Sequence, residues 1–166
     1  SDVTVEEYMH MIRLKTSVLL AGACYIGALI AGADEADARA FYEYGVNLGL
    51  AFQLRDDWLD TYGNPEVFGK AIGGDIVNRK KTWLLISALR ESRGELDGIL
   101  AEDLENDELI RQVKSVYSSL RLSDRCNHLI GEYASKAISA IAGVKIAPAD
   151  RAYFINLAES LSGRDK

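Results

Sequence analysis

Residues 53–60 read Gln-Leu-Arg-Asp-Asp-Trp-Leu-Asp, and this stretch indicates both the fold and the chemistry of the chain. On an α-helix of 3.6 residues per turn, one amide and three acids fall on adjoining ridges of one face: Gln53, Asp56, Asp57 and Asp60. Three carboxylates close together repel one another unless a cation lies among them. Mg²⁺ suits such a face, because it binds oxygen ligands and keeps positions for water and phosphate oxygens. The stretch predicts a metal site on a helix.

Basic residues follow this acidic helix within one short loop. Lys70 comes after Gly69, and residues 79–81 read Arg-Lys-Lys. Lysines beside a Mg²⁺ site favour an anionic ligand that also contacts the metal, and phosphate is the common choice. The two segments together indicate a metal–diphosphate site.

The composition of the 166 residues is that of one compact, mostly helical domain, with 48% hydrophobic residues and two prolines. The net charge of −6 argues against general attraction to nucleic acid or to an anionic membrane. Cys24 and Cys126 lack CxxC spacing, so we expect reduced thiols, typical of a cytoplasmic protein. The apolar run 18–33 is shorter than the roughly 20 residues of a membrane span. We therefore expect a buried helix there and no membrane span.

Helical patterns follow one another along the whole chain, which predicts an all-α fold and one helical unit over residues 1–166. Thr4 and Glu7 have the spacing of a capping box at the start of the first helix. We expect Asp75 or Asn78 to cap the helix that contains Trp83. The expected helices span residues 5–30, 34–62, a third through 83–92, 103–118, 123–142 and 148–161.

Residues 53–85 resemble the second aspartate-rich region of trans-isoprenyl diphosphate synthases, the polyprenyl synthetase family. The resemblance rests on an ordered set of short motifs, which is more specific than a lone Asp-Asp-x-x-Asp. The matching elements are Phe52-Gln53, Asp56-Asp57-x-x-Asp60, Gly69-Lys70, Asp75-Ile76 and Lys80 before Thr82-Trp83-Leu84. Upstream, Lys15-Thr16 is similar to a lysine–threonine pair on an earlier helix of these enzymes.

The resemblance implies a helical bundle, the C-terminal portion of the isoprenoid synthase fold. It also implies a prenyltransferase that condenses an allylic diphosphate with isopentenyl diphosphate, with Mg²⁺ as cofactor and as a homodimer at full length. This chain has one aspartate-rich motif where the family has two, and it is about half of a typical length. We therefore expect the C-terminal half of a longer synthase, inactive alone, and product chain length cannot be read from it.

The family pattern implies a role for each matching residue. Asp56 is the most direct Mg²⁺ ligand, whereas Asp57 and Asp60 act through metal-bound water or outer contacts. The resemblance assigns the allylic diphosphate to three lysines, Lys15, Lys70 and Lys80. It assigns the carbocation to the hydroxyl of Thr16 and the amide of Gln53.

Other residues have ordinary structural interpretations. Trp58 and Trp83 are expected in the core, and His10 and His128 lack metal-ligand spacing. Arg55 and Lys81 are interpreted as surface or salt-bridge residues. The basic ending with Arg164 and Lys166 is either a tail that closes over the site or a frayed terminus.

Two other functions remain open. A class I terpene cyclase shares the fold and the metal–diphosphate chemistry, but the Gln-x-x-Asp-Asp-x-x-Asp form with Gly-Lys after it favours a synthase. A non-catalytic helical subunit of a prenyl synthase is the second alternative.

Overall fold

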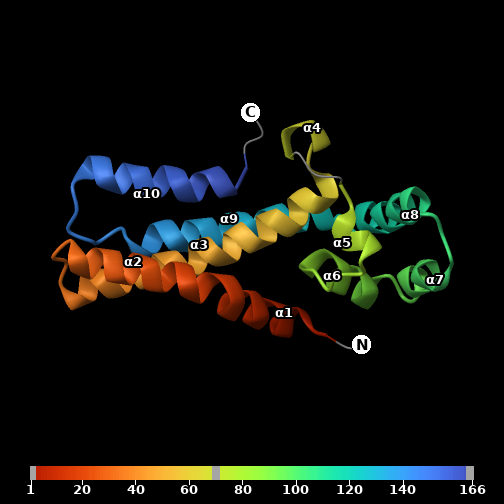
Figure 1. The fold of residues 1–166 in the computed structure, drawn as a ribbon, viewed down its shortest axis with the longest axis horizontal. Coiled ribbons are helices and arrows are strands. Elements are labelled where there is room, and N and C mark those ends of the chain that lie inside the picture. Colours follow the sequence, from red (N-terminus) through yellow and green to blue (C-terminus); the bar gives the residue numbers. More distant parts are fainter. Residues whose placement is uncertain (1–2, 69–71, 164–166) are drawn as a thin grey trace. The chain divides into compact units, whose positions relative to one another are not determined.

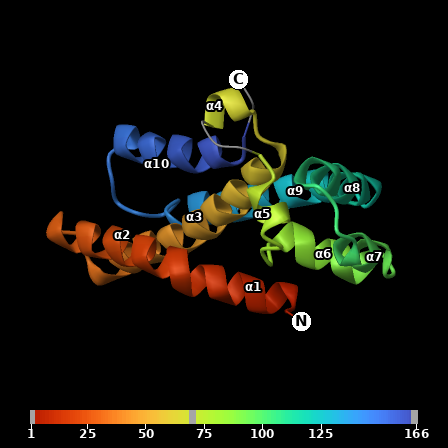
Figure 2. The same cartoon turned by 45° about the vertical axis from the view of Figure 1, so that its right-hand side comes forward.

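The structure, a computed structural model, describes residues 3–68 and 72–163. Its described residues form helices and no strand (Figures 1 and 2), which confirms the predicted all-α class. The elements in chain order are α1 (Val5–Ile12), the π-helix η1 (Arg13–Ser17), α2 (Val18–Ile30), α3 (Glu35–Tyr62), α4 (Pro65–Phe68), α5 (Gly74–Val77), α6 (Trp83–Glu91), α7 (Glu95–Ala101), α8 (Asn106–Ser119), α9 (Leu122–Ala140) and α10 (Pro148–Leu161).

Several helix ends follow from local sequence. The predicted capping box before α1 is present, because the Thr4 amide donates to Glu7 Oε2 (2.8 Å) and the Glu7 amide donates to Thr4 Oγ1 (3.1 Å). Helix α3 ends at Tyr62, as the following Gly-Asn-Pro predicts. Helix α10 begins with Pro148 in its first turn, where the missing N–H costs nothing.

The segment between α3 and α8 differs from the prediction. Neither Asp75 nor Asn78 caps the helix that contains Trp83, because α5 ends first and Arg79 adopts a left-handed φ of 50°. Thr82 caps α6 instead, and its Oγ1 accepts from the Leu85 amide (3.2 Å). Helix α7 was not predicted, because Gly98 in its middle weakens the helical pattern.

The chain divides into two compact units, each described by itself. One comprises residues 1–8 and 56–126, and the other comprises residues 9–55 and 127–166. We call them the acidic-motif unit and the long-helix unit. The prediction of a single helical unit over residues 1–166 remains a prediction.

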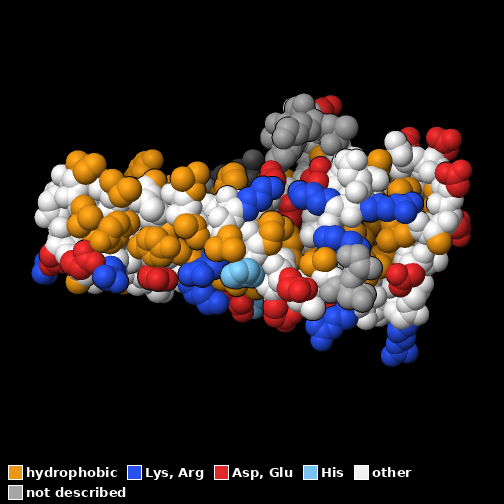
Figure 3. All heavy atoms as spheres, turned by 60° about the horizontal axis from the view of Figure 1, so that its bottom comes forward, with side chains coloured by type: hydrophobic (Ala, Val, Ile, Leu, Met, Phe, Trp, Pro, Cys, Tyr) orange, Lys and Arg blue, Asp and Glu red, His pale blue; other side chains and the backbone are white. Residues whose placement is uncertain are grey.

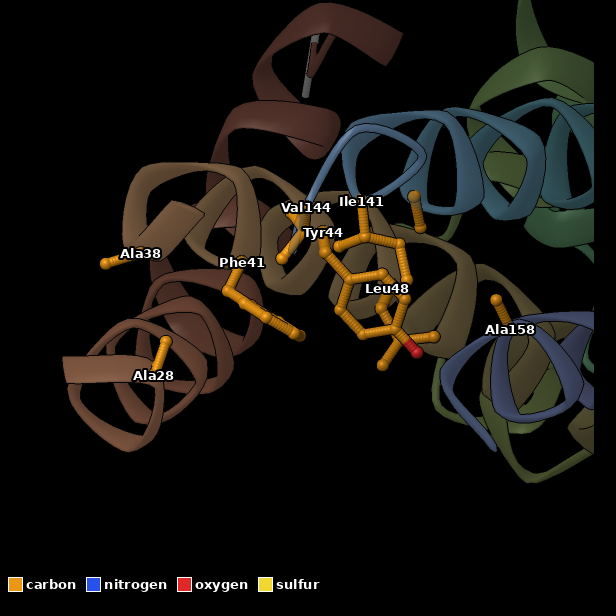
Figure 4. Close-up of a cluster of buried hydrophobic side chains, with 9 residues drawn as sticks. Ala28, Ala38, Phe41, Tyr44, Leu48, Ile141, Val144 and Ala158 are labelled. Atoms are coloured by element: carbon orange, nitrogen blue, oxygen red, sulfur yellow. The ribbon is translucent and has the colours of Figure 1, made fainter. Parts of the chain in front are cut away.

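An aromatic and aliphatic core holds the long-helix unit together. Phe41 and Tyr44 of α3 pack against Phe154 of α10, with ring centroids 5.0 and 5.5 Å apart, respectively. The Tyr44 hydroxyl donates to the Phe154 carbonyl (2.8 Å), so its polar end is satisfied although the side chain is buried. Figure 4 shows the buried residues of this core, which come from α2, α3, α9, the segment after α9, and α10.

Two glycines on α3 let the first long helix approach closely. A Cβ added at Gly45 would lie 2.5 Å from the Ala21 Cα, and one at Gly49 would lie 2.6 Å from the Ser17 Cα. Backbone atoms occupy those positions, so only glycine fits without moving a helix. The four-residue spacing of the glycines places η1 and α2 directly against α3 within the long-helix unit.

The apolar helix predicted to be buried is largely exposed in the described chain, so that prediction is wrong. Leu19 is 79% exposed and Ile30 is 83% exposed, and Figure 3 shows hydrophobic side chains gathered along this face. Helix Val5–Ile30, formed by α1, η1 and α2, is the one described helix long and apolar enough to cross a membrane by length and composition alone. The expected absence of a membrane span remains a prediction.

Candidate functional site

The middle acid of the motif is buried and hydrogen-bonded on both oxygens. Asp57 is 2% exposed, and its Oδ2 accepts from the Tyr8 hydroxyl at 2.5 Å. Its Oδ1 accepts from the Lys80 ammonium at 3.0 Å. Because a carboxylate in a low-dielectric environment needs such donors, these bonds explain how Asp57 can lie inside the acidic-motif unit.

Lys80 joins this acid to the start of α5. Its ammonium also donates to Asp75 Oδ2 at 2.7 Å. The Asp75 amide in turn donates to Asp60 Oδ2 at 2.8 Å, and the Gly73 amide donates to the Asp60 carbonyl at 2.6 Å. The last turn of α3 is thus bonded to the segment 73–80 through side chains and backbone alike.

The charges of this network shift the pKa values of its members. Burial raises the pKa of the Tyr8 hydroxyl well above its usual range, and neighbouring Asp57 raises it further. Burial opposes the charge of Lys80, yet hydrogen bonds to Asp75 and Asp57 raise the Lys80 pKa overall. Burial also raises the pKa of Asp75, which Lys80 offsets and the nearby Asp60 and Asp57 reinforce. Two carboxylates, Asp57 and Asp75, thus share the Lys80 ammonium, and Asp60 lies near enough to raise the Asp75 pKa.

The first acid of the motif has a different environment. Asp56 is exposed, whereas Asp57 is buried and Asp60 is partly buried. Within the described residues, no three His, Cys, Asp or Glu side chains converge in a way that could hold a metal ion. Asp57 points inward while Asp56 is exposed, because adjacent helix positions differ by about 100° in direction. The assignment of Asp56, Asp57 and Asp60 to a metal remains a prediction. The interpretation of Asp57 as an outer contact agrees with its geometry.

Asp56 and Asp60 suit a metal ion that takes only one or two ligands from the protein. Asp56 and Asp60 lie one turn apart on α3 and offer hard oxygen donors beside two further carboxylates, Asp57 and Asp75. Mg²⁺ usually binds through one or two carboxylates and keeps waters and phosphate oxygens as its other ligands. The donor set fits such an ion.

The three lysines predicted to contact diphosphate have different positions. Lys15 is exposed on η1, and Lys80 is 45% exposed at its side chain while it bonds Asp57 and Asp75. Lys70 lies outside the described residues, as do Arg164 and Lys166. The structure therefore places two of the three lysines and shows that Lys80 also serves the buried acids.

Thr16 and Gln53, the two residues assigned to the cation by the resemblance, are in contact within the long-helix unit. The Thr16 hydroxyl donates to Gln53 Oε1 at 3.1 Å. Thr16 lies in the π-helical segment η1, and such segments occur frequently at functional sites. The close approach of Ser17 to Gly49, one turn before Gln53, brings the two side chains together.

Arg55 is buried, so of its two interpretations, a surface residue or a salt-bridge residue, the first is wrong. Its side chain is 8% exposed, and its Nε donates to the Leu161 carbonyl at the end of α10 (2.7 Å). A Cβ at Gly163, whose φ is 57°, would overlap the Arg55 guanidinium. Arg55 therefore holds the end of α10 against α3 in the long-helix unit.

The remaining side chains have the structural roles expected of them. Trp58 and Trp83 are buried, and the Trp58 indole donates to Ser123 Oγ at 3.1 Å. His10 and His128 are exposed. Both cysteines are free thiols.

Sequence reasoning missed two members of the network around Asp57. Asp75 stood among the matching motif elements but was given no role, although its position five residues before Lys80 was a usable signal. Tyr8 carries no local signal, because it lies 49 residues before Asp57. Only the packing of α1 against α3 in the acidic-motif unit reveals it.

A large apolar cavity lies elsewhere. It has a volume of about 890 Å³ and is lined by α2, the α2–α3 turn, the first turns of α3, the segment before α10, and α10 itself. Phe41, the last α3 residue in this lining, precedes Asp56 by four turns of that helix. The cavity therefore does not belong to the acidic motif.

Comparison with known proteins identifies relatives of the whole chain. Residues 1–120 match the family model for polyprenyl synthetase. The geranylfarnesyl diphosphate synthase of Aeropyrum pernix is 34% identical over 157 residues, which cover 94% of this chain and 49% of that synthase.

Two solved structures share the fold over nearly the whole chain. The polyprenyl synthase from Caulobacter crescentus, complexed with calcium and isoprenyl diphosphate, gives a TM-score of 0.88 at 32% identity and covers 99% of this chain and 51% of its own. The geranylgeranyl pyrophosphate synthase from Corynebacterium glutamicum, complexed with isoprenyl diphosphate and magnesium, gives a TM-score of 0.88 at 27% identity, covering 99% and 48%.

The chain thus spans about half the length of the curated relatives it matches. Its all-α architecture is that of the isoprenoid synthase fold. The family model covers well over half of its residues, and the aspartate-rich motif lies within the matched part. The chain therefore belongs to the polyprenyl synthetase family.

Proposed function

We propose that this chain provides the second metal- and diphosphate-binding motif of an isoprenyl diphosphate synthase that condenses an allylic diphosphate with isopentenyl diphosphate. The observation that carries the proposal is the end of α3, where an exposed Asp56 stands beside a buried, fully hydrogen-bonded Asp57. The polyprenyl synthetase match favours a synthase over a terpene cyclase.

Asp56 and Asp60 would hold Mg²⁺, which, when bound, supplies positive charge to the diphosphate leaving group. Lys80 orients Asp57 and Asp75 and keeps its proton, since its pKa is raised. Lys15 and Lys70 would add point charges for the diphosphate. Charges held in place before the reaction would stabilise the pyrophosphate as it departs.

Thr16 and Gln53 would serve the other product of ionisation, the allylic cation. Neutral oxygen dipoles stabilise a carbocation without forming a bond to it or taking its proton. The Thr16 hydroxyl donates to the Gln53 carbonyl oxygen, which fixes the amide of Gln53. Such positioning of dipoles lowers the barrier only where they are held in place beforehand.

The chain alone is expected to lack turnover, because it carries one aspartate-rich motif where the resemblance implies two. The apolar face of α2, with Leu19, Ile26 and Ile30 exposed, supports a role within a larger helical assembly. A cytoplasmic location remains part of the proposal. A homodimer is the assembly that the family resemblance implies.

The proposal is tested by titrating the chain with pyrophosphate in the presence and absence of Mg²⁺, followed by calorimetry. We expect weak, saturable binding, with Kd in the millimolar range, that requires Mg²⁺ and is lost on adding a chelator. Pyrophosphate binding that ignores the metal, or no binding at all, would reject the proposed site.

A further inference from the structure

The acidic motif has a neutral hydrogen-bond donor beneath it. Tyr8 of α1 is 2% exposed, and its hydroxyl lies 2.5 Å from Asp57 Oδ2. The other oxygen of Asp57 accepts from Lys80 at 3.0 Å. Two elements far apart in the sequence thus determine where the carboxylate of Asp57 points.

The direction of Asp57 determines the direction of its neighbour. Consecutive side chains on an α-helix differ by about 100°, so a turn of α3 with Asp57 held inward presents Asp56 outward. If Asp57 were released, the last turns of α3 could rotate or fray, and the exposed carboxylate would lose its fixed position. Metal sites depend on such outer contacts to orient their ligands.

A tyrosine is chemically suited to this position. A second lysine or an arginine at Tyr8 would also hold Asp57, but it would cancel the negative charge that attracts a cation. The tyrosine hydroxyl donates one hydrogen bond and adds no charge. Its bond to Asp57 continues through Lys80 and Asp75 to the Oδ2 of Asp60.

We propose that Tyr8 is a positioning residue for the metal site: its buried hydroxyl fixes Asp57 and thereby the orientation of Asp56 and Asp60. The proposal rests on the function proposed above, because it assumes that these two carboxylates bind the metal. It assigns a role in metal binding to the first helix of the chain.

Tyr8→Phe tests the proposal, because it removes the hydroxyl and keeps the ring. Tyr44→Phe is the matched control, since Tyr44 is also fully buried and its hydroxyl also donates one hydrogen bond, to the Phe154 carbonyl (2.8 Å). Mn²⁺ affinity in the presence of pyrophosphate would be measured by electron paramagnetic resonance, and stability would be measured by urea unfolding.

We expect Tyr8→Phe to weaken Mn²⁺ binding about 10-fold, the usual lower range for loss of an outer contact, and Tyr44→Phe to leave it within about twofold. Tyr8→Phe should lose more stability than Tyr44→Phe, because its acceptor is a carboxylate. Affinity is therefore compared where urea unfolding shows both variants to be folded, so that a difference reports positioning. Equal affinity of the two variants would overturn the role of Tyr8 while the metal site stands. Absence of Mn²⁺ binding in the unmodified chain would instead reject the proposed function on which the role depends.

Discussion

Helix α3 packs in two different ways along its length. Its first part is held by apolar packing, and its last turns, which carry the proposed metal site, are held by hydrogen bonds among charged groups. In the long-helix unit its glycines and apolar side chains allow close backbone approach, as at Gly49 and Phe41. In the acidic-motif unit its last turns are held by directed hydrogen bonds among charged groups, centred on Asp57. Apolar packing has no preferred direction, whereas the bonds to Asp57 specify which acid faces outward.

The largest effect should come from removing the centre of the polar region. Asp57→Ala leaves Tyr8 and Lys80 without their shared acceptor, so we expect a loss of about 3 kcal/mol in the free energy of unfolding, measured by urea denaturation. Replacing Lys80 by methionine in the same chain should recover part of that loss, because the uncompensated ammonium is then absent. A single-variant loss below about 1 kcal/mol would show that the network does not hold α3.

A smaller loss is expected in the apolar region. Gly49→Ala places a Cβ 2.6 Å from the Ser17 Cα, so the helices must separate, at a cost of about 1–3 kcal/mol. Gly131→Ala on α9 is the matched control, because nothing lies within 4 Å of its added Cβ, and there we expect a gain of about 0.5–1 kcal/mol. Equal unfolding midpoints for the two variants would contradict the close approach of η1 to α3.

The smallest effect concerns a surface ion pair, which sharpens the contrast with the buried network. Arg125 donates from both terminal nitrogens to Glu91, at 2.7 and 2.8 Å, and these hydrogen bonds lower the Glu91 pKa below its ordinary 4.5. A lowered carboxyl pKa stabilises the fold above pH 4.5, and this contribution is lost as the pH falls through the lowered value. Glu91→Gln should cost less than about 1 kcal/mol at pH 7, because the pair is exposed.

The measurement is chemical unfolding of the unmodified chain and Glu91→Gln at neutral and acidic pH, with and without added salt. The difference between the two proteins should shrink in acid and in salt. A difference that stays constant with pH would mean that charge at Glu91 contributes nothing to stability.

Local sequence signals were enough to predict much of the fold. The Gly-Asn-Pro after Tyr62 and Pro148 at the start of α10 mark helix ends correctly, because turn and proline chemistry acts within a few residues. The π-helical turn at Lys15 and Thr16 was beyond such signals, since it depends on how η1 packs against α3. The exposure of α2 was also missed, because an apolar sequence does not reveal what covers it.

The site, too, has features that the sequence predicted and features that depend on tertiary packing. The sequence placed Asp56, Asp57 and Asp60 on one helix. The resemblance gave Thr16 and Gln53 a shared role at the cation, and the two side chains are in contact. The resemblance already distinguished Asp56, as the direct ligand, from Asp57, as an outer contact, but the sequence did not show which side chains hold Asp57 inward. That distinction depends on Tyr8 and Lys80, which lie 49 and 23 residues away along the chain. Long-range partners of this kind are set by tertiary packing.

The most direct test compares Asp56→Asn with Asp57→Asn in one assay of Mg²⁺-dependent pyrophosphate binding and one of unfolding. Asp56→Asn should abolish metal-dependent binding and leave the unfolding midpoint unchanged, because that side chain is exposed. Asp57→Asn should lower the unfolding midpoint, because its two buried hydrogen bonds lose their charged acceptor. If instead Asp56→Asn destabilises the fold or binds Mg²⁺ and pyrophosphate normally, the division of roles between the two adjacent acids is wrong.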